Sequence, residues 1–85
     1  MRIYDLKDKE VINICDCRKL GYVEDVNIDP CTGCVKELIV PEHSKVFCLF
    51  GEDFEYVIPW CCVRQMGEDI ILVEVKTKEI RHLCN

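Results

Sequence analysis

The sequence of 85 residues contains no long apolar run. Its longest uninterrupted apolar stretch is Val46 to Phe50, far short of the roughly 20 residues that a membrane-spanning helix needs. The first ten residues are polar and contain neither the apolar core nor the cleavage site of a secretory signal peptide. We therefore expect a chain without a membrane span that resides in the cytoplasm.

Residue types that support catalysis or phosphate binding are also sparse. Only two histidines, His43 and His82, are available as a base for a nucleophile, and both lie among polar residues. The four glycines are isolated, so no glycine-rich phosphate loop is present. Basic residues form no stripe, and the net charge of −5 opposes binding to nucleic acid. These absences predict a protein that is not an enzyme and does not bind DNA or RNA.

Short β-branched segments separated by turn residues are the dominant pattern. They recur at intervals of about 8–12 residues, which is typical of a small sandwich or barrel. The pattern predicts an all-β fold, mainly antiparallel, with at most one short helical turn between Cys61 and Met66. Closure into a barrel would protect the strand edges of so small a sheet. We expect six strands, over residues 10–14, 20–28, 34–40, 46–50, 54–58 and 69–76.

Three details of this pattern bear on the architecture. The second strand is long, and a β-bulge near Glu24 and Asp25 would keep both acids out of the core and bend the strand into a barrel wall. The run Ile70 to Val73 is apolar on both faces, so its strand should be central. We expect one domain over residues 1–76, followed over residues 77–85 by a polar C-terminal tail that is a frayed helix or disordered.

Several segments, taken in order, carry a resemblance to a known family. They are Asp5–Asn13, Lys19–Asp29, Thr32–Gly33, Ile39–Pro41, Phe50–Gly51, Tyr56–Trp60 and Met66–Val73. Their order and spacing resemble PRC-barrel domains, in particular the YlmC/YmxH family of sporulation-associated PRC-barrel proteins. The resemblance covers about residues 2–76 and implies a six-stranded β-barrel that serves as a protein-docking or assembly module. It implies no catalytic residues.

Eight cysteines are present, and Cys15, Cys17 and Cys34 depart from the pattern of that family. In a reducing cytoplasm cysteines are buried apolar residues, metal ligands or redox thiols. Alternate turns of a meander lie at the same end of the sheet. We therefore expect that Cys15 and Cys17 could converge with Cys61 and Cys62 on a zinc ion or an iron–sulfur cluster.

A second cysteine motif, Cys31-Thr32-Gly33-Cys34, occupies the tip of a predicted hairpin. Its two thiolates suit zinc, which needs four ligands. A straight second strand would place this motif roughly 25 Å from Cys17, so the two motifs cannot share one ion within a monomer. A second chain, or in part Cys48, would complete the site. Two alternatives to a metal site stay open for the cysteines. They could form a thiol redox switch, or they could be small buried apolar side chains.

The apolar run from Val46 to Phe50 predicts an interaction surface. Phe47 and Leu49 share one face of the predicted strand, and Phe50 lies on the other. In a barrel one of these faces points outward, where an exposed apolar surface marks a contact with a partner or with a second copy. The sequence therefore predicts a non-enzymatic protein-interaction or adaptor module without a cofactor. The alternative is a cysteine-based protein that binds zinc or acts by thiol redox chemistry.

Overall fold

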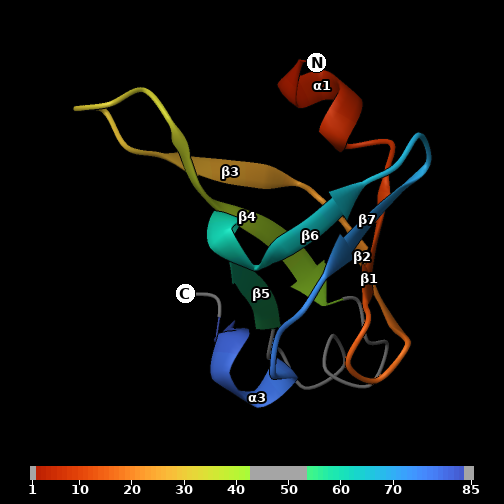
Figure 1. Ribbon diagram of the computed structural model, residues 1–85. Helices are drawn as coiled ribbons and strands as arrows, with labels where there is room; N and C mark the ends of the chain where they lie inside the picture. Colours follow the sequence, from red (N-terminus) through yellow and green to blue (C-terminus); the bar gives the residue numbers. More distant parts are fainter. Residues whose placement is uncertain (1, 43–53, 84–85) are drawn as a thin grey trace.

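The computed structural model describes residues 2–42 and 54–83 (Figure 1). The predicted interface residues Phe47, Leu49 and Phe50, the strand predicted over 46–50 and Cys48 lie outside the described residues. The helical elements are α1 (Ile3–Leu6), η1 (Trp60–Cys62) and α3 (Thr77–Ile80). The strands are β1 (Glu10–Asn13), β2 (Arg18–Tyr22), β3 (Asp25–Ile28), β4 (Val35–Glu42), β5 (Phe54–Pro59), β6 (Val63–Met66), β7 (Ile70–Val73) and β8 (Arg81–Leu83).

These strands form two sheets of four, in the orders β2-β1-β7-β6 and β3-β4-β5-β8. Each pair of neighbours is antiparallel except β1 and β7, which run parallel. β7 lies between β1 and β6, which confirms the prediction that the apolar run Ile70 to Val73 is central. The fold is all-β with little helix, as the alternating pattern predicts.

The prediction of six strands closed into a barrel is wrong for the described part of the chain. It holds eight strands in two sheets that are not hydrogen-bonded into a closed barrel. The strand expected over 20–28 is split into β2 and β3, which belong to different sheets. The break, in place of the expected bulge, lets Val23 stay buried while Glu24 and Asp25 remain exposed. The Glu24 amide still donates to the Ile39 carbonyl, at 2.9 Å.

The prediction of at most one helical turn is also wrong. η1 overlaps only the first two residues of the segment where that turn is expected, the rest of which is β6, and α1 and α3 are additional helices. The segment expected as a frayed or disordered tail contains α3 and β8, and β8 pairs with β5. Ile80 explains this order, because its side chain is 7% exposed and joins the core. Burial of an aliphatic side chain of this size stabilises the fold by about 1.5–3 kcal/mol.

Alternate residues of the central strands supply the core. In each of β1, β4, β5 and β7 buried side chains alternate with half-buried ones, which is the period of a pleated strand. The two sheets and α3 therefore share one apolar interior. Its buried members are Leu6, Val11, Leu20, Val23, Leu38, Val40, Tyr56, Ile58, Ile71, Val73, Val75 and Ile80.

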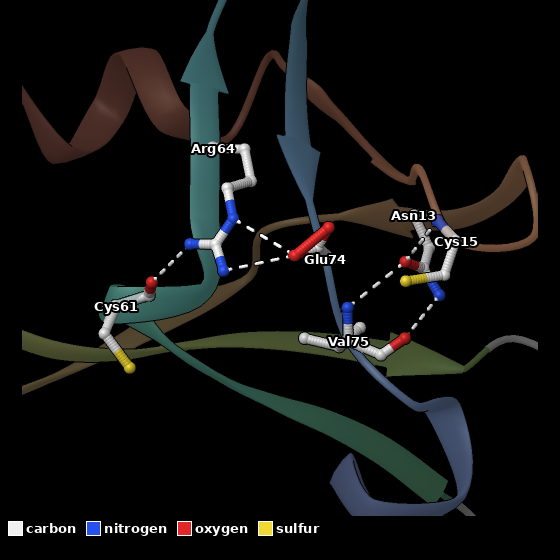
Figure 2. A network of polar contacts seen from close by, with 6 residues as sticks. All are labelled: Asn13, Cys15, Cys61, Arg64, Glu74 and Val75. Carbon is white, nitrogen blue, oxygen red and sulfur yellow. Dashed lines mark hydrogen bonds and ion pairs between the residues drawn. The ribbon is translucent and has the colours of Figure 1, made fainter.

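Asn13, at the end of β1, is a polar side chain within this interior and is 1% exposed. Its Nδ2 donates to the Val75 carbonyl at 2.8 Å, and its Oδ1 accepts from the Val75 amide at 3.3 Å (Figure 2). The same Oδ1 accepts from the Cys15 amide at 3.2 Å. Val75 lies beyond the end of β7, where no neighbouring strand in the described part of the chain pairs with its backbone. The Asn13 side chain makes the two hydrogen bonds that such a strand would make. Asn13 thus holds the chain at the point where it leaves the sheet toward α3.

Replacing Asn13 with alanine should lower the free energy of unfolding by about 2–3 kcal/mol, because it leaves the buried amide and carbonyl of Val75 without partners. The matched control is Asn27→Ala. Asn27 donates to Glu37 at 2.9 Å on the exposed face of β3, and its loss should cost less than about 0.5 kcal/mol. Urea denaturation of both variants measures the difference. Equal costs for the two variants would contradict this role of Asn13.

Candidate binding groove

An open groove of about 530 Å³ lies where three segments meet: the β1–β2 turn, the end of β5 with η1, and the segment from β7 into α3. We call it the Cys15 groove. An adjoining hollow of about 390 Å³ shares part of its wall and continues past Asp16 and Thr77. The residues that line the groove are Cys15, Pro59, Cys62, Glu74, Val75, Lys76, Glu79 and Ile80.

Hydrogen bonds to backbone groups hold the three walls together. The Cys15 amide donates to Asn13, which also binds Val75 on the opposite wall. The Glu74 amide donates to the Cys62 carbonyl at 3.0 Å and so ties the segment after β7 to η1. Val75 and Ile80 are buried and belong to the core. The floor of the groove is therefore continuous with the rigid interior of the domain.

The groove has charged groups at its rim. Arg64 forms an ion pair with Glu74 at 3.3 Å and donates from Nη1 to the Cys61 carbonyl at 2.8 Å (Figure 2). Both side chains of this pair are about half exposed, at 48% and 47%, so the pair adds little to stability. Lys76 and Glu79 are exposed beside the apolar floor. The groove therefore combines apolar walls with charges of both signs.

Burial raises the pKa of the Cys62 thiol, and a hydrogen bond with Cys61 and the nearby charge of Cys61 raise it further. Cys62 is half-buried, whereas Cys61 is exposed. A raised pKa keeps the thiol protonated at neutral pH, and a protonated thiol is a weak nucleophile. Cys62 therefore acts as a polarisable, mainly apolar part of the groove wall.

The structure brings together two of the four cysteines for which the sequence predicts a common metal site. Cys15 and Cys62 line the same groove, which agrees with the prediction that their turns share one end of the fold. Cys17 and Cys61 are exposed and do not line it. Within residues 2–42 and 54–83, no three His, Cys, Asp or Glu side chains lie close enough to hold one metal ion. Zinc binding by these cysteines stays a prediction.

Cys31 and Cys34 lie far from the groove. Both are exposed on the turn that joins β3 to β4. Figure 1 shows this hairpin projecting from the body of the domain, at the end opposite to the β1–β2 turn and α3. This arrangement agrees with the prediction that Cys31 and Cys34 lie far from Cys15 and Cys17. The strand between the two motifs is broken, however, and not straight as the prediction assumes.

A second, polar hollow of about 310 Å³ is lined by Arg18, Glu42, Tyr56, Thr77, Lys78 and Arg81. Arg81 binds both carboxylate oxygens of Glu42, at 2.7 and 3.1 Å, and its guanidinium lies 3.8 Å from the centroid of the Phe54 ring. Burial raises the pKa of the Tyr56 hydroxyl, and a hydrogen bond to Glu42 adds to this effect. These contacts join the start of β8 to the ends of β4 and β5.

The segment 74–80 forms much of the groove wall, and sequence reasoning missed it. The sequence pattern places residues 74–76 in the last strand and residues 77–80 in the tail. A signal was available, because Val75 and Ile80 are apolar residues within an otherwise polar stretch. No local pattern indicates that Arg81 would pair with Glu42, 39 positions earlier.

The fold and the groove define a small all-β domain built from two packed sheets, and the comparisons with known proteins place it in a family. The family model described as the PRC-barrel domain matches residues 1–80. The chain belongs to the PRC-barrel domain family, as its sequence pattern indicates. In the described part of the chain, no helix is long and apolar enough to cross a membrane.

Named relatives come from two bacteria. The chain is 37% identical over 73 residues to the "Probable sporulation protein YlmC" of Bacillus subtilis. The aligned region covers 86% of this chain and 90% of that protein. It is 29% identical over 77 residues to the "Uncharacterized protein YmxH" of the same species, in an alignment that covers 88% of this chain and 89% of that protein. It is 37% identical over 68 residues to the "Uncharacterized protein CA_C1697" of Clostridium acetobutylicum, in an alignment that covers 80% of this chain and 77% of that protein. The predicted similarity to YlmC and YmxH is confirmed.

The raised pKa of Cys62 predicts slow alkylation. At pH 8 with limiting iodoacetamide, Cys62 should react more slowly than Cys31, because burial favours its neutral thiol and the thiolate is the reactive form. The rates are measured by tandem mass spectrometry at low conversion. The difference should narrow as the pH is raised, because more of the Cys62 thiol then ionises. A ratio that does not change with pH would mean that access, and not ionisation, limits the reaction.

Proposed function

We propose that this chain is a non-enzymatic protein-interaction module that acts in the cytoplasm during sporulation, and that its partner docks in the Cys15 groove. The observation that carries the proposal is the composition of the groove: an apolar floor with Val75 and Ile80, beside the exposed charges of Lys76 and Glu79. Protein interfaces have the same anatomy, with an apolar centre and a polar rim. The name of the relative YlmC supports a role in sporulation.

The open shape of the groove suits a segment of a protein partner. Its volume is about 530 Å³. An open groove of this size accepts one or two apolar side chains of a partner segment. Charged residues flanking those side chains would pair with Lys76 and Glu79. The partner is thus a protein segment with an apolar anchor between charged residues.

Trp60 adds a second contact for such a partner. It is 40% exposed and begins η1, the turn that also supplies Cys62. Tryptophan is enriched among the residues that dominate binding energy at interfaces. The rigid core behind the groove supports this use, because a preformed site loses little conformational entropy on binding.

The first experiment captures the partner in cells. A photo-crosslinking amino acid replaces Lys76 at the groove rim or, as a control, Lys36, an exposed residue of β4 on the other sheet. Cells that carry the chain are irradiated during growth and during sporulation. We expect one protein to crosslink at position 76 and not at position 36, and to do so during sporulation. Equal crosslinking at both positions, or none at position 76, would refute the assignment of the groove.

The second experiment measures the affinity of that purified partner by calorimetry. Cys15→Arg places a large charged side chain in the groove at an exposed position and should weaken binding at least about tenfold, or about 1.4 kcal/mol. Cys31→Arg is the matched control, because Cys31 is also an exposed cysteine on a turn but lies outside the groove. Both titrations contain a chelator. Unchanged affinity of Cys15→Arg would exclude the Cys15 groove as the docking surface.

A further inference from the structure

We propose that Cys31 and Cys34 are half of a zinc site and that the same two cysteines of a second copy of this chain complete it. The site would join two domains through the tips of their β3–β4 hairpins. It is separate from the Cys15 groove and adds a metal-dependent dimer to the proposed function.

The turn that carries both cysteines is held by its own backbone. The Asp29 amide donates to the Cys34 carbonyl at 2.9 Å, and the Gly33 amide donates to the Asp29 carbonyl at 2.7 Å. Gly33 has φ 74°, a left-handed conformation that glycine adopts without a Cβ clash. A Cβ at Gly33 would meet nothing within 4 Å, so the tip is open on this side. The turn therefore presents its thiols to solvent from a defined loop.

The other polar groups of the turn are engaged within it. Asp29 Oδ1 accepts from the Cys31 amide at 2.9 Å, and Thr32 Oγ1 accepts from the Cys34 amide at 3.3 Å. The Cys34 thiol lies 3.9 Å from the Thr32 carbonyl oxygen, a weak contact that zinc binding would replace. Both thiols are exposed and form no disulfide. The tip therefore offers two thiols for a metal ion.

Two thiols are half of what structural zinc requires. Structural zinc is almost always bound by four ligands in a tetrahedron, with Zn–S distances of about 2.3 Å. In the part of the chain that the structure describes, no third His, Cys, Asp or Glu lies close enough to join them. A second copy of this chain would supply the other two thiols with twofold symmetry.

The shape of the hairpin permits this contact. The tip projects beyond the body of the domain (Figure 1), so two tips can meet while the sheets stay apart. The turn leads directly into β4.

Formation of the site releases protons. One Zn²⁺ and four thiols give one zinc tetrathiolate with two negative charges and four H⁺, and no atom changes its oxidation state.

The test uses the chain of 85 residues, reduced and freed of metal, to which zinc is added in steps. Sedimentation velocity and elemental analysis should show a dimer that holds one zinc per two chains and dissociates with chelator. Cobalt in place of zinc should give the absorption bands of a tetrahedral tetrathiolate. Cys31→Ser and Cys34→Ser should each abolish zinc binding and the dimer, because each leaves two of the four thiols that the site needs. Cys61→Ser, which removes an exposed thiol outside the hairpin, should change neither.

Each other outcome refutes the proposal. Zinc bound by a monomer, a dimer that persists with chelator, or zinc binding that survives Cys31→Ser would place the ligands elsewhere. Absence of zinc binding, or a disulfide between Cys31 and Cys34 in the protein purified from cells, would also overturn it. Cys15→Arg should leave the zinc-linked dimer intact, so failure of the Cys15 groove and failure of this site are distinguishable.

Discussion

The bidentate contact between the Asn13 side chain and the backbone of Val75 is the constraint on which the rest of the structure depends. Val75 lies beyond the last residue of β7, where the ladder with β1 has ended. Without a partner its amide and carbonyl would be buried and unpaired, which is costly. Asn13 supplies both partners from the strand next to β7. The direction in which the chain leaves the first sheet is thereby set.

Several later features follow from that direction. The chain passes from Val75 into α3, Ile80 enters the core, and β8 reaches the edge of the second sheet beside β5. The pair of Arg81 and Glu42 then closes this end of the second sheet. The same segment forms one wall of the Cys15 groove, and Asn13 also binds the Cys15 amide on the other wall. One buried amide thus shapes both the packing of the two sheets and the candidate docking surface.

The two groups of cysteines have different surroundings and suit different roles. Cys62 is half-buried in a groove wall, where its raised pKa favours the neutral thiol. Cys31 and Cys34 are exposed on a projecting turn, where their thiols can meet those of another molecule. A metal-linked pair of domains would carry two Cys15 grooves, and two linked sites bind a partner with repeated segments more tightly than one site does.

The sequence predicted what short-range patterns determine. Alternation of apolar residues located β1, β4, β5 and β7, and the turn residues from Asp29 to Cys34 located the β3–β4 hairpin. The break of the long strand at Val23 was not predictable in this way, because it depends on β2 and β3 joining different sheets. The parallel pairing of β1 with β7 was not predictable either, because it joins residues about 60 positions apart. The buried role of Asn13 has the same origin: its partner Val75 is 62 positions away.

Hydrogen exchange at the Val75 amide tests the account most directly. This amide belongs to no helix or strand, and its hydrogen bond is to the Asn13 side chain. If that contact holds the exit of the chain from the sheet, the amide should exchange as slowly as those of the core strands β1 and β7, as measured by NMR in native buffer. Exchange as fast as that of the exposed residues of the β3–β4 turn would show that the contact does not hold the chain, and the explanation of the groove would then be wrong.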